Sequence, residues 1–271
     1  MRFSTATVLT LCAVLAIAVG IAFSGAERRA SGQSPETSSA SANVPRTADG
    51  TPSLEGIWQA LNTAAWDLQD HNGRLGVPAG QGVVEGNDIP YQDWALAKKK
   101  ENFEKRATLD PEAKCYMPGV PRITYMPFPF QIAQSSDHIL IIYEYVHIHR
   151  LLPTDGGAHP DPEVIDFWMG DSRAHWEGDT LVVDVRNFND QTWFDRAGNF
   201  HSDALHVVER YTRVGPDHIA YEATIEDPKV FTRPWKISMP LYRRQEQDMQ
   251  LLEYECYAYE RDNRLETSGT R

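Results

Sequence analysis

The segment Tyr143–Arg150 holds the densest set of side chains capable of acid–base or metal chemistry. We predict that it lies in one strand, where alternate residues share a face, so His147 and His149 point the same way. Two imidazoles on one strand face can present a metal ion, as they do in cupin barrels. Further ligands would come from elsewhere in the chain, the candidates being His159, Asp161 and His201. The alternative is a solvated histidine pair without a metal, because His-x-His alone is a weak metal signal.

The other face of the same strand carries Glu144 and Arg150 between isoleucines. If this face points into the fold, both charges must be paired, because an unpaired buried charge is very costly. We predict that they either contact a polar ligand inside the fold or pair with neighbours for a structural reason. Which face points inward decides whether the histidines or the charged residues are the candidate site.

A second cluster lies in the segment His201–Arg210. A histidine near a carboxylate suits general acid–base catalysis, because its ordinary pKa is near neutrality and the carboxylate fixes its tautomer. His201 and Asp203 are therefore candidate catalytic residues, although a turn-capping role for Asp203 is the alternative. In the strand that follows, His206 and Glu209 fall on opposite faces, and both are candidate contacts for a ligand.

Short strands joined by polar turns must position these residues. After Pro118, runs of β-branched and aromatic residues bounded by Gly, Pro, Asp and Ser predict four hairpins. Their strands span 130–134 and 139–152, 172–176 and 180–188, 205–214 and 218–225, and 236–243 and 251–259. One helix is predicted at 91–107. We expect a mainly β fold, an antiparallel up-and-down barrel or barrel-like sandwich of about eight to ten strands, with one helix in the N-terminal half.

Composition and motifs exclude several function classes. The formal charge is -12 and the basic residues are scattered, which disfavours a nucleic-acid or anionic-membrane partner. No alternation of strands and helices appears, so a dinucleotide-binding fold is excluded. Ser172 and Ser202 lack a Gly-x-Ser-x-Gly context, so a hydrolase nucleophile is not supported.

The N-terminus has the layout of a secretory signal peptide. Arg2 precedes an apolar run at 8–23, and small residues follow up to Ala26. We predict a signal peptide at 1–26, a flexible Ser/Ala/Pro-rich leader at 27–53 and a single β-rich domain at 54–271. The protein is then exported to the periplasm or the outside, without a membrane span in the mature chain; an uncleaved N-terminal anchor is the alternative.

Cys115 and Cys256 are the only cysteines that remain after signal removal. An even pair in an oxidising compartment predicts one disulfide, which would join an early loop to the last strand. The alternative is two separate buried thiols.

Two resemblances support the export and fold predictions. The segments that carry the first are Trp168–Ser172, Trp176–Val183, His201–His206, Asp227–Pro228 and Leu251–Cys256. With them the chain resembles a broad family of exported bacterial proteins usually described as hypothetical. That resemblance implies an exported, β-rich, single-domain protein and no site residues. Gly56-Ile57-Trp58 followed by up-and-down hairpins is also similar to lipocalin and fatty-acid-binding barrels.

The leading functional hypothesis is an exported barrel that binds a small, partly apolar molecule, with four polar contacts: Glu144, Arg150, His206 and Glu209. The second is an acid–base or metal-dependent lyase, isomerase or hydrolase that uses His147, His149, His201 and Asp203. The third is an envelope interaction module, which would expose a large apolar patch. The sequence does not name a cofactor.

Overall fold

The computed structural model describes residues 44–74 and 76–258. The predicted signal peptide and most of the predicted leader lie outside the described residues. Residues 44–53, the described end of that leader, form a turn in which Thr47 and Thr51 are hydrogen-bonded. Arg46 in this turn pairs with Asp179, Nη2 to Oδ2 2.6 Å.

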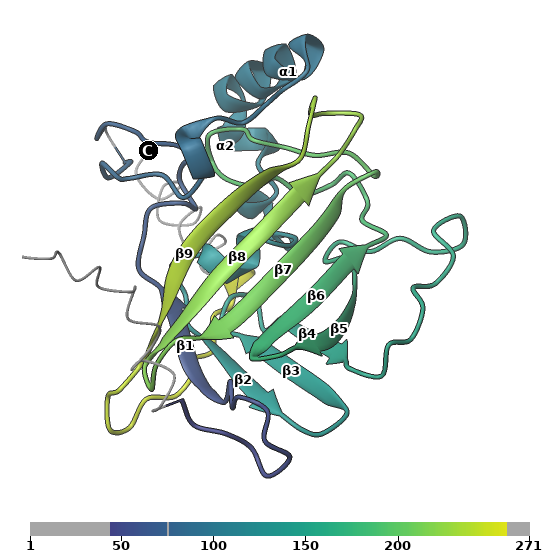
Figure 1. Ribbon diagram of the computed structural model, residues 1–271. Helices are drawn as coiled ribbons and strands as arrows, with labels where there is room; N and C mark the ends of the chain where they lie inside the picture. The colour runs from purple at the N-terminus through teal and green to yellow at the C-terminus, as the bar shows by residue number, and fades with distance from the viewer. Residues whose placement is uncertain (1–43, 75, 259–271) are drawn as a thin grey trace, which may run out of the picture. The chain divides into compact units, whose positions relative to one another are not determined.

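Nine antiparallel strands form one nearly closed, barrel-shaped sheet (Figure 1). Their order across the sheet is β4-β3-β2-β1-β9-β8-β7-β6-β5. The strands are β1 Gly56–Ala60, β2 Phe130–Gln134, β3 His138–Tyr143, β4 His149–Pro153, β5 Asp171–Glu177, β6 Thr180–Arg186, β7 His206–Arg213, β8 His218–Glu226 and β9 Trp235–Arg243. The mainly β prediction is confirmed.

Alternation along the strands separates an inner face from an outer one. In β7 every second residue is buried, beginning with Val207, and β8 repeats the pattern beginning with Ile219. The inner residues are large and nearly inaccessible, among them Trp58, Phe130 and Tyr221. Because successive side chains of a strand point to opposite faces, this period-two pattern fills the inside of the sheet with a core.

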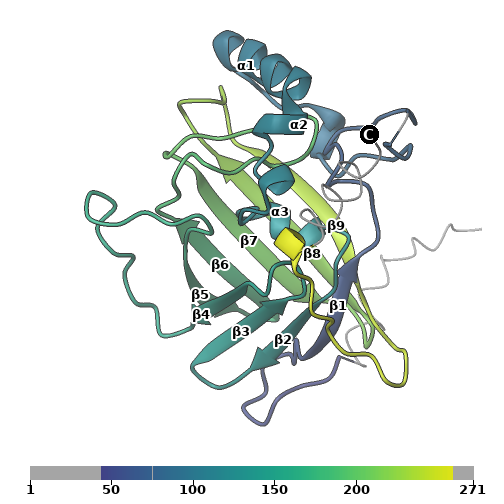
Figure 2. The ribbon, with the colours of Figure 1, turned by 180° about the vertical axis from the view of Figure 1, so that it is seen from behind.

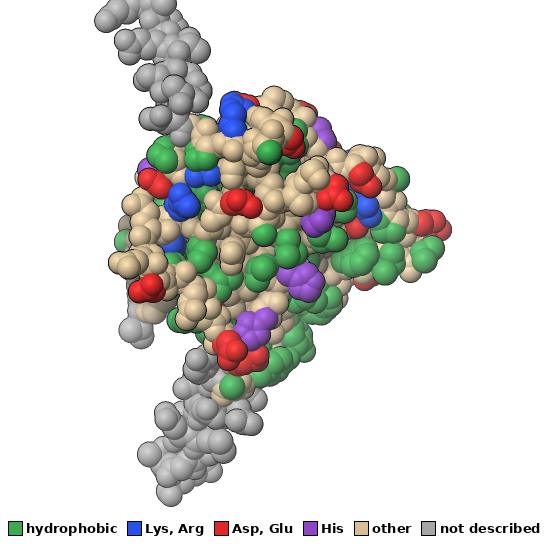
Figure 3. Space-filling view, turned by 90° about the horizontal axis from the view of Figure 1, so that it is seen from below, with side chains coloured by type: hydrophobic (Ala, Val, Ile, Leu, Met, Phe, Trp, Pro, Cys, Tyr) green, Lys and Arg blue, Asp and Glu red, His purple; other side chains and the backbone are tan. Residues whose placement is uncertain are grey.

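Short helices cover one end of the sheet (Figure 2). They are η2 Glu85–Asn87, α1 Asp93–Glu104, α2 Arg106–Leu109, η3 Glu112–Lys114 and α3 Arg122–Tyr125. The helix predicted at 91–107 corresponds to α1. The opposite end shows basic and acidic side chains scattered among others and not gathered by sign (Figure 3). Among the residues described, no helix is long and apolar enough to cross a membrane.

The predicted strand at 139–152 is wrong, because the chain turns back in its middle. β3 ends at Tyr143 and β4 begins at His149, and the two pair as a hairpin. Val146 and His147 adopt positive φ of 43° and 53° in the turn between them. Valine disfavours this conformation, and no Gly or Pro marks the turn in the sequence. The proposed face shared by His147 and His149 therefore does not exist.

The predicted last strand is also absent from the described part of 251–259. Both edges of β9 are occupied, by β8 and β1, so residues 251–258 have no place in the sheet next to it. Tyr254 forms an isolated bridge with Tyr145 instead. The disulfide is confirmed: Cys115 and Cys256 are bonded, and Cys256 lies in a helical turn rather than a strand.

Candidate functional site

A pocket of about 560 Å³ is lined by residues of α2, η3 and the C-terminal segment, among others. We call it the cap pocket. Its walls combine aromatic and cationic side chains, of which six matter here: Trp66, Tyr145, Tyr254, Arg74, Arg106 and Arg196. This volume and this mixture of apolar walls with a few polar groups are typical of small-molecule sites.

Buried ion pairs build one wall of the cap pocket. Arg122, fully buried, bonds both carboxylate oxygens of Asp110 at 2.9 and 3.1 Å and reaches Glu112 at 2.6 Å. Arg196 bonds the same Glu112 at 2.8 and 2.5 Å. Burial alone would raise the pKa of Glu112, but the two guanidinium groups outweigh it and hold that pKa below its ordinary value. Glu112 therefore stays charged, and its ion pairs join η3 to α3 and to the Arg196 segment.

Tyr145 is the exceptional lining residue of the cap pocket. Its ring packs against Phe128 and Tyr254, with centroids 5.3 and 5.6 Å away. The residue is 1% exposed, and its hydroxyl has no hydrogen-bond partner among the residues the structure describes. Burial, followed by the negative charge of Glu112, raises the pKa of this phenol, so it stays protonated as a donor. A buried donor without an acceptor is costly and points to a missing partner.

The inside of the sheet holds a different polar group, built on Arg150 and Glu209. Arg150 Nη2 on β4 lies 2.5 Å from Glu209 Oε2 on β7. Tyr211 and Tyr221 both donate to Glu209 Oε1, at 2.9 and 2.8 Å. Burial raises the pKa of both phenols, so they remain donors. The structure thus brings together Arg150 and Glu209, two of the predicted ligand contacts. They bond each other and neighbouring side chains of the protein rather than a ligand.

The other two predicted ligand contacts lie elsewhere. Glu144 sits in the β3–β4 turn, where its carboxylate accepts a hydrogen bond from the Leu252 backbone at 2.8 Å. It fastens the C-terminal segment and does not meet Arg150. His206 lies on the outer face of β7, as the alternation predicts, and not inside the sheet.

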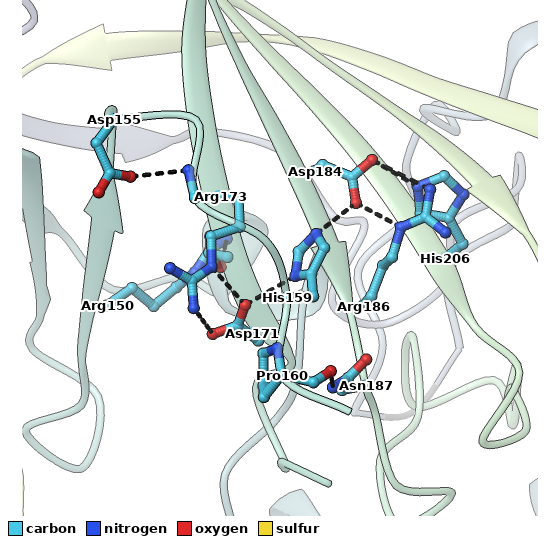
Figure 4. A network of polar contacts seen from close by, with 12 residues as sticks. Arg150, Asp155, His159, Pro160, Asp171, Arg173, Asp184, Arg186, Asn187 and His206 are labelled. Atoms are coloured by element: carbon cyan, nitrogen blue, oxygen red, sulfur yellow. Dashed lines mark hydrogen bonds and ion pairs between the residues drawn. The ribbon is translucent and has the colours of Figure 1, made fainter. Parts of the chain in front are cut away.

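His206 belongs to a chain of carboxylates and imidazoles on the outer face of the sheet (Figure 4). His159 bonds Asp171 through Nδ1 at 2.7 Å and Asp184 through Nε2 at 3.0 Å. Asp184 also bonds His206 Nε2 at 3.0 Å, and His206 Nδ1 lies 3.5 Å from Glu226. Sequence reasoning missed this group, since its members come from a loop and four strands.

The cap pocket is the best-supported candidate site, because it combines ligand-sized space, arginines and the unpartnered Tyr145 hydroxyl. Thr63 and His71 also carry a buried polar atom without a partner among the described residues, but the pockets that they line contain no arginine. No protein-family model matches the chain, and no curated protein sequence matches it. Its function must therefore be inferred from its own side chains.

The two histidines of the predicted metal site do not gain a third ligand. Both are exposed, and His147 Nδ1 lies 3.2 Å from Glu255 Oε1. They line a second pocket beside the disulfide. Among the described residues, no group of three or more His, Cys, Asp or Glu is placed to hold a metal ion.

His201 and Asp203 are likewise not brought together as an acid–base pair. His201 is 3% exposed; its Nδ1 donates to the Ser202 carbonyl at 2.8 Å, and its Nε2 accepts from the Thr192 hydroxyl at 2.6 Å. Burial lowers its pKa, so it is neutral at pH 7. Asp203 is exposed and pairs with Lys229 at 2.6 Å. Both ring nitrogens of His201 are therefore already used.

Proposed function

We propose that the protein is exported and binds a small, partly apolar molecule in the cap pocket. The observation that carries this proposal is the buried Tyr145 hydroxyl, which lacks an acceptor among the described residues. A ligand oxygen within reach of this hydroxyl would supply that acceptor. The rings of Trp66 and Tyr254 offer apolar surface for the rest of the molecule.

Arg122 and Arg196 pair with the lining carboxylates of Asp110 and Glu112. Arg74 and Arg106 then outnumber the remaining carboxylate, that of Glu104, which favours a ligand whose polar part carries negative charge. The guanidinium groups of Arg74 and Arg106 lie over the Phe103 ring, 4.5 and 4.2 Å from its centroid. Arg196 lies 5.2 Å from the Trp66 ring centroid. Stacking holds a guanidinium in place. Because Arg196 already donates to Glu112, Arg74 and Arg106 are the cations that can donate to a ligand. A compound with a carboxylate and an apolar body would satisfy these groups together.

Export is part of the proposal. It rests on the signal-peptide pattern, and the disulfide between Cys115 and Cys256 supports it, because disulfides persist in oxidising compartments. A lipocalin-like place for the ligand inside the sheet is not what we propose. Buried side chains occupy that interior, and Arg150 and Glu209 neutralise each other there.

Native mass spectrometry of protein purified from the periplasm tests the proposal. We expect a bound small molecule that organic solvent releases from the wild-type protein. Tyr145→Phe removes only the hydroxyl and should weaken binding about threefold to tenfold. Tyr242→Phe, at the far end of β9, is the matched control and should retain the ligand. Absence of a bound molecule from the wild-type protein, or equal binding by Tyr145→Phe, would count against the proposal.

A further inference from the structure

A third pocket, of about 400 Å³, is walled by four aromatic rings. We call it the aromatic pocket. Trp94 on α1 and Tyr116 next to the disulfide are 53% and 41% exposed. Trp193 and Phe200 are 8% and 9% exposed. Large rings left open to solvent at the rim of a cavity are a frequent sign of a binding surface.

Side chains that form hydrogen bonds line the same pocket as these rings. Asp190 and Gln191 lie next to Trp193 in the chain, and Gln191 Nε2 donates to Asp190 Oδ1 at 2.5 Å. Lys98 on α1 is paired with Glu101 at 3.2 Å. The other charged lining residues are Lys114 and Asp190, so the charges of the pocket nearly cancel. The pocket thus suits a neutral ligand with several hydrogen-bonding groups.

We propose that the aromatic pocket binds a neutral saccharide. One face of a sugar ring presents C–H groups, which pack on aromatic rings, while its hydroxyls both donate and accept hydrogen bonds. A wholly apolar ligand would not use the hydrogen-bonding capacity that Asp190 and Gln191 retain beyond their bond to each other. A charged ligand would disturb the balance between Lys114 and Asp190.

The geometry favours binding over cleavage of the sugar. Hydrolysis of a glycosidic bond generally needs two carboxyl groups flanking it, and Asp190 is the one carboxylate that lines this pocket. His201 also lines it, but both of its ring nitrogens are hydrogen-bonded within the protein. No lining residue is shared with the cap pocket, so the two proposals are independent.

Isothermal titration of the purified chain with cellotetraose, maltotetraose and chitotetraose tests this inference. We expect at least one of them to bind with a dissociation constant of about 1 mM or tighter. Trp94→Ala and Tyr116→Ala should each weaken that binding at least about tenfold. Leu96→Ala is the matched control, because Leu96 is on the same helix and 42% exposed but does not line the pocket. Circular dichroism and thermal melting show that each variant is folded.

Three results would overturn the inference. The first is the absence of binding to all three sugars at about 10 mM. The second is unchanged binding in both folded variants. The third is binding that Tyr145→Phe abolishes and Trp94→Ala does not, which would place the sugar in the cap pocket and leave the first proposal standing.

Discussion

Arg150 and Glu209 form an ion pair across the inside of the sheet, although they are on β4 and β7 and 59 residues apart. Their side chains are 3% and 0% exposed. The same Arg150 donates to Ser172 on β5 at 3.0 Å, so one side chain on the edge strand β4 contacts the other edge strand, β5, as well as β7. The closed arrangement of the strands therefore brings the buried charges of Arg150 and Glu209 together, and they neutralise each other.

Arg150→Met should destabilise the fold strongly, because it leaves the Glu209 carboxylate buried with only phenolic donors. We expect a loss of about 3–5 kcal/mol, measured by urea unfolding. The double variant with Glu209→Gln should lose less than the sum of the two single variants, because the orphaned charge is removed. Additive losses would show that the two residues do not depend on each other.

The sequence predicts which face of β7 each of its residues occupies, but it does not predict the contacts that these residues make with other strands. Alternation alone places Glu209 inside and His206 outside, and the structure agrees. The partner of Glu209 depends on β4 facing β7 across a closed sheet, which no local pattern encodes. From the sequence we predicted that Glu144 and Arg150 share one face of a single strand. In the structure the turn after Tyr143 separates them.

The cap pocket was beyond sequence reasoning for a related physical reason. Trp66, Arg196 and Tyr254 come from three irregular segments without periodicity, so nothing in the local pattern relates them. A long-range link that can be predicted is the disulfide, because only two cysteines are left to pair. It brings the segment after Tyr254 to the loop at Cys115.

Loss of the disulfide should lower stability without destroying the sheet. Its cysteines are 141 residues apart, for which the loop-entropy model gives about 4 to 5 kcal/mol as an upper value. Cys115→Ser should abolish the mobility shift between reducing and non-reducing gels and lower the melting temperature. Far-ultraviolet circular dichroism should still report the sheet, because neither cysteine lies in a strand. A variant that keeps the gel shift would refute the bond.

His201 should make stability fall in mild acid. Burial lowers its folded-state pKa below 6.5, so under acid conditions the unfolded chain binds the proton first. The free energy of unfolding therefore decreases as pH falls from about 6.5 towards the lowered value. His201→Gln should flatten this part of the curve, measured as melting temperature between pH 8 and 5. His175→Gln, an exposed histidine on β5, is the control and should keep the wild-type slope.

Asp195 should have the opposite effect on the pH dependence of stability, because its pKa is raised in the folded state. Burial, followed by the charge of Asp67, raises its pKa from 3.8 to about 6. Between these values the folded chain binds more protons than the unfolded one, so this group's contribution to stability is lost as pH rises to about 6. Asp195→Asn should remove that loss, seen as a steeper gain in melting temperature from pH 4 to 6 than in the wild type. An unchanged profile would show that the carboxyl group titrates normally.

The connection between β4 and β5 should loosen when His159 is removed. This segment, residues 154–170, is fastened by His159 to Asp171 and Asp184, and by its Pro160 carbonyl to the Asn187 side chain at 2.8 Å (Figure 4). His159→Ala takes away two of these contacts but no core side chain. We expect about tenfold faster hydrogen exchange in 156–168, with protection of β6 and β7 unchanged, because local opening does not need global unfolding. His175→Ala, whose partner Glu177 is at the far end of β5, should leave the segment protected. Faster exchange throughout the sheet would instead show that His159 supports the whole fold.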